Sequence, residues 1–174
     1  MVSAQIITIM LLLVSESLVT GMKSRYKYSS RLYTKADSLT ENHNGKPLYG
    51  NIQHCGLLVS DTIRSIRFYQ EAFGMTDETH LRNPKLLYKG GWLRAGASQI
   101  HLMELPNPDP VSGRPDHGGR DRHVALTCGT GSLENIKARL RLLNVPFTMS
   151  KSGRPALFCR DLDGNALEFM EEEL

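Results

Sequence analysis

Short apolar runs separated by polar breaks follow one order along the chain, and this order occurs twice. In each half, an apolar run with a histidine near its start is followed by a polar break. A segment then follows whose apolar residues recur at three- and four-residue steps. The first pattern predicts a buried strand and the second an amphipathic helix. The chain is therefore expected to contain an internal repeat, whose copies begin near residues 52 and 123.

The first copy is expected to contain one strand, one helix and several shorter strands. Ile52 to Val59 is short, apolar and bounded by turn residues, which predicts a buried strand. Asp61 is expected to cap the following helix, and Gly74 stands where that helix would end. Turn residues then separate shorter apolar runs. These runs predict strands around 86–88, around 91–94 and at 99–105.

The second copy repeats this order. His123 to Cys128 predicts a strand, Ser132 the N-cap of a helix, and Val145-Pro146 the stop of that helix. Further strands are expected at 147–150, 156–160 and 166–170. The intervening residues 106–119 contain four prolines and predict a linker. The simplest interpretation is the α+β class, with two βαβββ modules at about 51–105 and 120–171 forming a single domain over 49–174.

Residues 1–48 have a different composition. Ala4 to Val14 is mostly apolar but shorter than the roughly 20 residues of a membrane-spanning helix. From Ser17 to Ala36 there is no acidic residue, while Lys and Arg alternate with Ser, Thr and Tyr. This composition is typical of an organellar targeting segment, with a disordered tail as the alternative. We expect import into an organelle and no membrane span in the mature protein.

The net charge argues against one class of partner. Residues 1–48 carry six Lys or Arg and three Asp or Glu, so the remaining chain has 15 residues of each sign. A protein that binds nucleic acid needs a basic face that neutralises several phosphates. The expected folded part is neutral, so we expect no nucleic-acid partner.

Each predicted module places one potential metal ligand on its first strand and one on its last. The spacing is 47 residues in the first module and 45 in the second. Histidines with a carboxylate suit Zn, Ni, Mn or Fe(II) better than Ca. A strand histidine taken singly is more often satisfied by hydrogen bonds, whereas a carboxylate within an apolar strand is costly to bury alone. The four candidates are His54, His101, His123 and Glu168, whereas His43, His80 and His117 are expected to be solvated.

Several motifs together resemble a known family, the vicinal oxygen chelate superfamily. This superfamily includes glyoxalase I, methylmalonyl-CoA epimerase, fosfomycin resistance proteins, extradiol dioxygenases and bleomycin resistance proteins. The resemblance covers about residues 51–170 and is carried by the segments 54–61, 68–75, 100–102, 123–125 and 161–168. The segments 105–110, 118–123 and 148–156 are similar to a plant and cyanobacterial glyoxalase-like subgroup that is often targeted to plastids. The resemblance implies a curled mixed sheet around a central cleft and a plastid location, with the secretory pathway or another organelle as the alternative.

The resemblance also assigns roles to the candidate ligands. His54 and His123 correspond to the first-strand ligands and Glu168 to the last-strand carboxylate. His101 stands where glyoxalase I has a glutamate that serves proton transfer, so His101 and Glu168 are the candidate catalytic residues. A neutral histidine can act as a base near pH 7.

The leading hypothesis is an enzyme whose divalent metal binds two vicinal oxygens of a small substrate and stabilises an enediolate or a similar oxyanion. A lactoylglutathione lyase-like reaction is its most concrete form. Arg122, Arg154 and Arg160 are candidates for holding an anionic substrate, with surface ion pairs as the alternative.

Two other functions stay open. His54, His123 and Glu168 alone would make the two-histidine, one-carboxylate site of an Fe(II) extradiol dioxygenase. A module that binds a small molecule without metal, like the bleomycin resistance proteins, would instead use an aromatic cleft. Residues Tyr88, Trp92 and Phe158 could line that cleft. The resemblance also implies a possible homodimer, since members of the superfamily often complete each metal site with modules from two subunits; the ligands of this protein can meet within one chain or across an interface.

Overall fold

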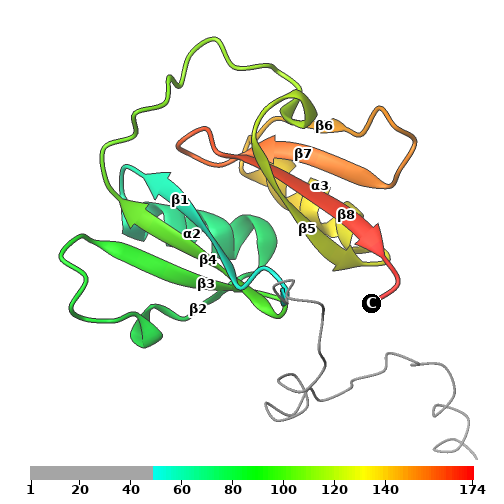
Figure 1. The fold of residues 1–174 in the computed structure, drawn as a ribbon. Coiled ribbons are helices and arrows are strands. Elements are labelled where there is room, and N and C mark those ends of the chain that lie inside the picture. Colours follow the sequence, from blue (N-terminus) through cyan, green and yellow to red (C-terminus); the bar gives the residue numbers. More distant parts are fainter. Residues whose placement is uncertain (1–48) are drawn as a thin grey trace, which may run out of the picture. The chain divides into compact units, whose positions relative to one another are not determined.

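The repeat predicted from the sequence forms two similar four-stranded sheets, one from each half of the chain (Figure 1). The computed structural model describes residues 49–174, and the elements below belong to one compact unit, Gly50–Leu174. The strand orders are β1-β4-β3-β2 and β5-β8-β7-β6. In each sheet the first and last strands of the module pair in parallel, and the other pairs are antiparallel. The predicted α+β class with two βαβββ modules is confirmed.

The elements of the two modules correspond one to one, apart from two short 3₁₀ turns, η2 and η3. The first module consists of β1 (His54–Val59), α2 (Thr62–Phe73), β2 (Thr76–Asp77), η2 (Thr79–Leu81), β3 (Gly90–Ala95) and β4 (Ser98–Glu104). The linker contains η3 (Gly118–Arg120). The second module consists of β5 (His123–Gly129), α3 (Ser132–Leu142), β6 (Phe147–Met149), β7 (Ala156–Arg160) and β8 (Ala166–Glu172).

The helix ends follow local sequence chemistry, with one correction. The Asp61 carboxylate accepts a hydrogen bond from the backbone N–H of Arg64, and Gly74 ends α2 in the left-handed region at φ 69°. For α3 the predicted N-cap was wrong. Ser132 is the first helical residue, and the cap is Gly131 at φ 84°, a conformation that glycine adopts at little cost.

Two strand predictions in the first module also need correction. Residues 86–88 form no strand: 87 and 88 lie in a bend, and Leu87 is fully exposed. The first strand after α2 is instead β2, which pairs with β3 at Thr76 and Asp77. Strand β1 begins at His54 and not at Ile52 as predicted. Ile52 precedes the strand and is 79% exposed. The expected buried strand is therefore buried on one face only.

Each helix covers one face of its own sheet. Figure 1 shows α2 behind the first sheet and α3 behind the second, and both helices contact their sheets. The hydrophobic core lies on these helix-covered faces; it includes Phe68, Tyr69, Leu93, Ile100, Leu102, Leu140, Leu157, Leu167 and Phe169. Side chains alternate across a strand, so the neighbours of these core residues point to the opposite face. We call that opposite face the open face of each sheet.

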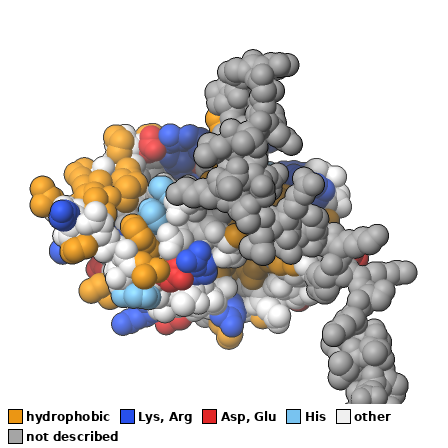
Figure 2. Space-filling view, turned by 60° about the horizontal axis from the view of Figure 1, so that its bottom comes forward, with side chains coloured by type: hydrophobic (Ala, Val, Ile, Leu, Met, Phe, Trp, Pro, Cys, Tyr) orange, Lys and Arg blue, Asp and Glu red, His pale blue; other side chains and the backbone are white. Residues whose placement is uncertain are grey.

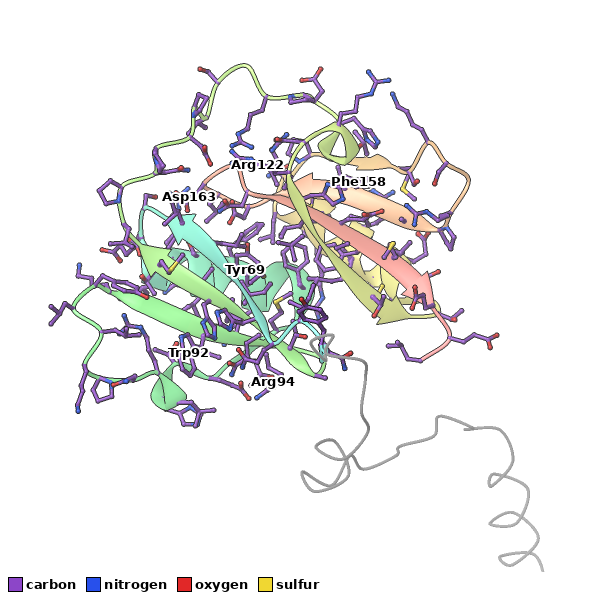
Figure 3. The ribbon with its side chains drawn as sticks, viewed as in Figure 1. Tyr69, Trp92, Arg94, Arg122, Phe158 and Asp163 are labelled. Atoms are coloured by element: carbon purple, nitrogen blue, oxygen red, sulfur yellow. The ribbon has the colours of Figure 1, made fainter. Side chains whose placement is uncertain are left out.

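The β7–β8 turn joins the second module to the first. The hydroxyl of Tyr69 on α2 donates to Asp161 Oδ2 at 2.9 Å, and Asn165 Nδ2 donates to the Leu58 carbonyl at 3.0 Å. The backbone N–H of Ser60 donates to Asp163 Oδ1 at 3.0 Å. Figure 3 shows Tyr69 and Asp163 at this junction. These bonds fix the orientation of one open face relative to the other.

The targeting segment predicted for residues 1–48 lies outside the described residues. Among residues 49–174, no helix is both long enough and apolar enough to cross a membrane. On the face of the molecule seen in Figure 2, acidic and basic side chains lie among exposed hydrophobic ones.

Candidate metal centre

The first sheet brings two of the predicted ligands together on its open face. The rings of His54 on β1 and His101 on β4 stack with centroids 4.0 Å apart and an interplanar angle of 12°. Trp92, paired with His101 in the register of β3 and β4, stacks on the other side of His101 at 4.4 Å and 4°. His101 is therefore held between two flat rings.

Hydrogen bonds fix the edges of both imidazoles. His54 Nδ1 is hydrogen-bonded to Gln53 Oε1, and His101 Nε2 lies 3.1 Å from Gln99 Oε1. Burial lowers the pKa of His101, and the nearby His54 lowers it further. Both effects disfavour a charged ring, so His101 is neutral near pH 7 and can accept a proton or a metal.

A polar network of Gln99, Glu78 and Arg94 supports this pair. Gln99 is 6% exposed and donates from Nε2 to Glu78 Oε2 at 2.7 Å. Arg94 forms a salt bridge with the same Glu78 carboxylate, with Nε 3.0 Å from Oε1 and a terminal nitrogen 2.8 Å from Oε2. Hydrogen bonds from Arg94 and then from Gln99 lower the pKa of Glu78, so its carboxylate is ionised at neutral pH.

The second sheet brings the other two predicted ligands together. His123 Nε2 on β5 lies 3.2 Å from Glu168 Oε2 on β8. His123 Nδ1 lies 2.8 Å from the Asp121 carbonyl oxygen, which can only accept, so Nδ1 carries a proton and Nε2 is the nitrogen that faces Glu168. Such a carbonyl partner is the usual support of a metal-binding histidine.

Glu168 is the least satisfied polar residue of this face. Its side chain is 5% exposed, and its Oε1 is buried without a hydrogen-bond partner among the described residues. The nearest cation is Arg154, whose guanidinium nitrogen is 3.6 Å from Oε1, beyond hydrogen-bond distance. A buried carboxylate oxygen without a partner is costly, so this atom is available for a bound cation.

His117 was expected to be solvated, and this prediction was wrong. The linker folds back over the second sheet, where His117 Nδ1 lies 2.8 Å from Thr148 Oγ1. The His117 ring packs against Phe158 with centroids 4.8 Å apart, and His123 packs on the same Phe158 ring at 5.5 Å. Gly118 permits this approach, because a Cβ there would lie 3.2 Å from Phe158. The Gly118-Gly119 pair is the only local sequence signal of this contact.

The three candidate substrate-binding arginines have different surroundings. Arg160 donates to the carbonyls of Gly164 and Pro115, each at 2.8 Å, and it pairs with Asp121 at 2.9 Å, which anchors the linker. Arg122 pairs with Asp109 at 2.6 Å and lines a cavity of about 270 Å³ together with His123. Figure 3 shows Arg122 above the second sheet. Of the three, Arg154 lies next to Glu168 and is 62% exposed, which leaves it accessible to a ligand.

Asp121 connects the linker to the second pair of ligands. Its carboxylate accepts two hydrogen bonds from Arg114, at 3.0 and 2.8 Å, while its backbone carbonyl holds His123. The hydrogen bond from Arg114 is the largest cause that lowers the pKa of Asp121 to about 2, and Arg160 adds to it. The ion pairs of this carboxylate thus fix the residue that orients His123.

The described residues of one chain bring the four predicted ligands together as two pairs. His54 and His101 lie on the first sheet, and His123 and Glu168 on the second. Within residues 49–174 there is no group of three or more His, Cys, Asp or Glu side chains that could hold a metal ion. The four candidate ligands therefore lie in one chain as two separate pairs.

The predicted aromatic residues do not form one cleft. Trp92 stacks on His101 on the first sheet, whereas Phe158 packs against His117 and His123 on the second. Figure 3 shows Trp92 and Phe158 on different sheets. Tyr88 lies before β3 with Arg82 above its ring, 4.9 Å from the centroid.

This fold and these paired ligands agree with a family assignment. The chain belongs to the glyoxalase/bleomycin resistance protein/dioxygenase superfamily, whose model matches residues 51–169. The resemblance to this superfamily noted in the sequence is thereby confirmed.

The chain is also similar to known relatives and solved structures over most of its length. A glyoxylase I homologue of Arabidopsis thaliana, named Glyoxylase I 4, is 26% identical over 129 residues, covering 71% of this chain and 72% of the relative. A virulence protein of Salmonella typhimurium is 27% identical over 146 residues, covering 80% of this chain and 98% of that protein. The fosfomycin resistance protein FosX of Listeria monocytogenes, in a mutant form complexed with Mn(II) and 1S,2S-dihydroxypropylphosphonic acid, is 19% identical with a TM-score of 0.54. That match covers 74% of this chain and 95% of FosX, and it shows a shared fold.

Proposed function

We propose that the protein is a divalent-metal enzyme that acts on two neighbouring oxygen atoms of a small substrate, in a reaction like that of glyoxalase I. The observation that carries this proposal is Glu168 Oε1, which is buried without a hydrogen-bond partner among residues 49–174, on a carboxylate whose other oxygen lies 3.2 Å from His123 Nε2. Membership of the superfamily and the similarity to the Arabidopsis glyoxylase I homologue support it.

The donor set fits a first-row divalent ion. His54, His101, His123 and Glu168 would supply imidazole nitrogens and one carboxylate, a set that suits Zn, Ni, Mn or Fe(II). An ion held there supplies Lewis acidity, which polarises oxygen atoms of a substrate. The related FosX structure contains Mn(II), which lies within this group of metals.

We further propose that two copies of the chain complete the site. Each open face carries half of the donor set, and the described residues of one chain do not join the halves. A homodimer in which the first open face of one copy meets the second open face of its partner would bring the halves together. Such an interface would be isologous and would contain two equivalent sites.

The protein residues have distinct tasks in this reaction. Isomerisation of a hemithioacetal moves a proton between two adjacent carbons, so a base must take the proton and return it. His101 is neutral near pH 7, so its ring nitrogen can take this proton when the metal is held by His54, His123 and Glu168 alone. Arg154 is positioned to hold an anionic group of the substrate by charge-assisted hydrogen bonds.

Metal dependence is the first test of this proposal. Protein purified without chelators is expected to contain about one transition metal ion per site, measured by elemental analysis. At one hundred times its dissociation constant the metal stabilises the fold by about 2.7 kcal/mol, which corresponds to a rise in Tm of roughly 10 °C. The same metal is expected to support formation of lactoylglutathione from the glutathione hemithioacetal. Metal-free protein whose Tm does not respond to Zn, Ni, Mn or Fe(II) would contradict the proposal.

We also propose that residues 1–48 direct the protein to a plastid. Their composition supports this, as does the plant origin of one relative. A fluorescent reporter fused to residues 1–48 is expected to colocalise with chlorophyll in leaf cells. A matched fusion in which Lys23, Arg25, Lys27, Arg31 and Lys35 are replaced by Glu should remain in the cytosol. Cytosolic or secreted reporter from the unmodified segment would refute plastid import.

A further inference from the structure

Gln99 lies on the open face of the first sheet between a carboxylate and a candidate ligand. Its side-chain nitrogen donates to Glu78 Oε2 at 2.7 Å, and its side-chain oxygen lies 3.1 Å from His101 Nε2. The residue is 6% exposed, so water offers these atoms little alternative. Position 99 thus connects Glu78 to His101 through one amide.

The chemistry of Glu78 decides which way this amide points. A carboxylate that is paired with Arg94 can only accept hydrogen bonds. If the amide of Gln99 were reversed, its oxygen would face the Glu78 oxygen without a proton between them. The nitrogen of Gln99 therefore faces Glu78, and its oxygen faces His101.

The amide orientation in turn decides the tautomer of His101. An amide oxygen has no proton to give, so His101 Nε2 must carry the hydrogen of this bond. In a neutral imidazole the other nitrogen, Nδ1, is then unprotonated. Stacking on Trp92 and His54 holds the plane of the ring, and the bond to Gln99 selects which edge faces the network.

His101 therefore differs from the other two candidate histidines. His54 donates from Nδ1 to Gln53, and His123 donates from Nδ1 to the Asp121 carbonyl, so both present Nε2. His101 presents Nδ1 instead.

We propose that Gln99, held by Glu78, is a positioning residue that fixes His101 as the Nε2–H tautomer and makes Nδ1 its proton- or metal-accepting atom. The role assigned to Nδ1 rests on the proposed function, whereas the tautomer does not. Neither Gln99 nor Glu78 contacts a substrate in this scheme. They act through His101.

The tautomer is measurable in the metal-free full chain by long-range ¹H–¹⁵N NMR of the imidazole nitrogens at pH 7.5. His101 is assigned by the loss of its signals in His101→Asn. In the unmodified protein, Nε2 should give the shift of a protonated nitrogen and Nδ1 that of an unprotonated one. In Gln99→Leu the ratio of Nε2–H to Nδ1–H should fall roughly five- to tenfold, the factor expected for one lost hydrogen bond.

Two further variants make the test specific. Gln53→Leu removes the partner of His54 on the same open face and should leave the His101 ratio unchanged. Glu78→Gln keeps the size of the side chain but frees the Gln99 amide to reverse, so it should lower the ratio even if Gln99→Leu fails to fold. A protonated Nδ1 on His101 in the unmodified protein, or an unchanged ratio in both Gln99→Leu and Glu78→Gln, would overturn the proposal.

Added Zn(II) separates this inference from the proposed function. Bound zinc should shift His101 Nδ1 while Nε2 keeps its proton, whereas His54 and His123 should respond at Nε2. Zinc bound through Nε2 of His101 would overturn the inference. If no histidine responds to zinc while the tautomer is as expected, the metal site fails and the positioning role of Gln99 stands.

Discussion

Glu168→Gln is expected to lower metal affinity at least about 100-fold and to abolish metal-supported turnover, while the metal-free protein loses no stability. Loss of a supporting residue around a metal typically costs about 10- to 100-fold, and Glu168 is proposed to be a ligand. The substitution also neutralises a carboxylate whose Oε1 is buried without a hydrogen-bond partner within residues 49–174. Removing a buried charge that is only partly satisfied by hydrogen bonds relieves a desolvation cost in the metal-free fold.

The two opposite effects make this variant informative. Titration calorimetry would give the affinity, and thermal unfolding with and without metal would give the two stabilities. Glu172→Gln is a matched control, because Glu172 lies at the exposed end of the same strand. The metal affinity and the thermal stability of this control should equal those of the unmodified protein. A Glu168→Gln protein that keeps its metal affinity but unfolds at lower temperature would mean that Glu168 has a structural role and no metal role.

The fold could be predicted from the sequence because the signals for each strand and helix lie within a few neighbouring residues. The helix-covered faces carry apolar residues at regular spacing, and Asp61 and Gly74 mark the ends of α2 by their side-chain and backbone chemistry. The error at 86–88 has a physical reason, since an apolar run predicts burial only where another surface can cover it. Leu87 has no such surface.

The positions of the candidate ligands on their strands could also be predicted, but not how these residues group. His54 and His101 occupy equivalent strands to His123 and Glu168, and the repeat reveals this correspondence. Whether the four meet depends on how the sheets face each other, which is decided by long-range bonds such as that between Tyr69 and Asp161. No local pattern encodes those bonds.

The supporting residues were the hardest to predict. In the sequence, nothing distinguishes Gln99 and Glu78 from other polar residues. Their connection to His101 depends on contacts between segments that are separate in the sequence. The one available signal is alternation, which places Gln99 and His101 on the same face of β4. The contact of His117 with Thr148 could not be predicted, because the sequence of a proline-rich linker does not show which face of the sheet the linker crosses.

Asp161→Asn is expected to destabilise the protein by about 2–4 kcal/mol at pH 7, because it disrupts the junction between the modules. Asp161 is 7% exposed and accepts hydrogen bonds from Tyr69, from the backbone of Asp163, and from both the backbone and the side chain of Asn165. An asparagine side chain has one accepting oxygen, and its amide group would meet donors that also need an acceptor. Urea unfolding of the two proteins measures the difference. Asp116→Asn, in an exposed part of the linker, should change stability by less than about 0.5 kcal/mol.

The same variant has a predicted pH dependence. Burial is the largest effect on the pKa of Asp161 and raises it above the ordinary 3.8, although the hydrogen bonds from Asn165, Asp163 and Tyr69 oppose this rise. Between 3.8 and the raised value the folded state binds more protons than the unfolded state, so the contribution of Asp161 to stability falls as pH rises through that window. The cost of Asp161→Asn should therefore be larger at pH 4 than at pH 7. A cost that instead grew from pH 4 to pH 7 would mean that hydrogen bonding outweighs burial at this carboxylate and that its pKa in the folded protein is lowered.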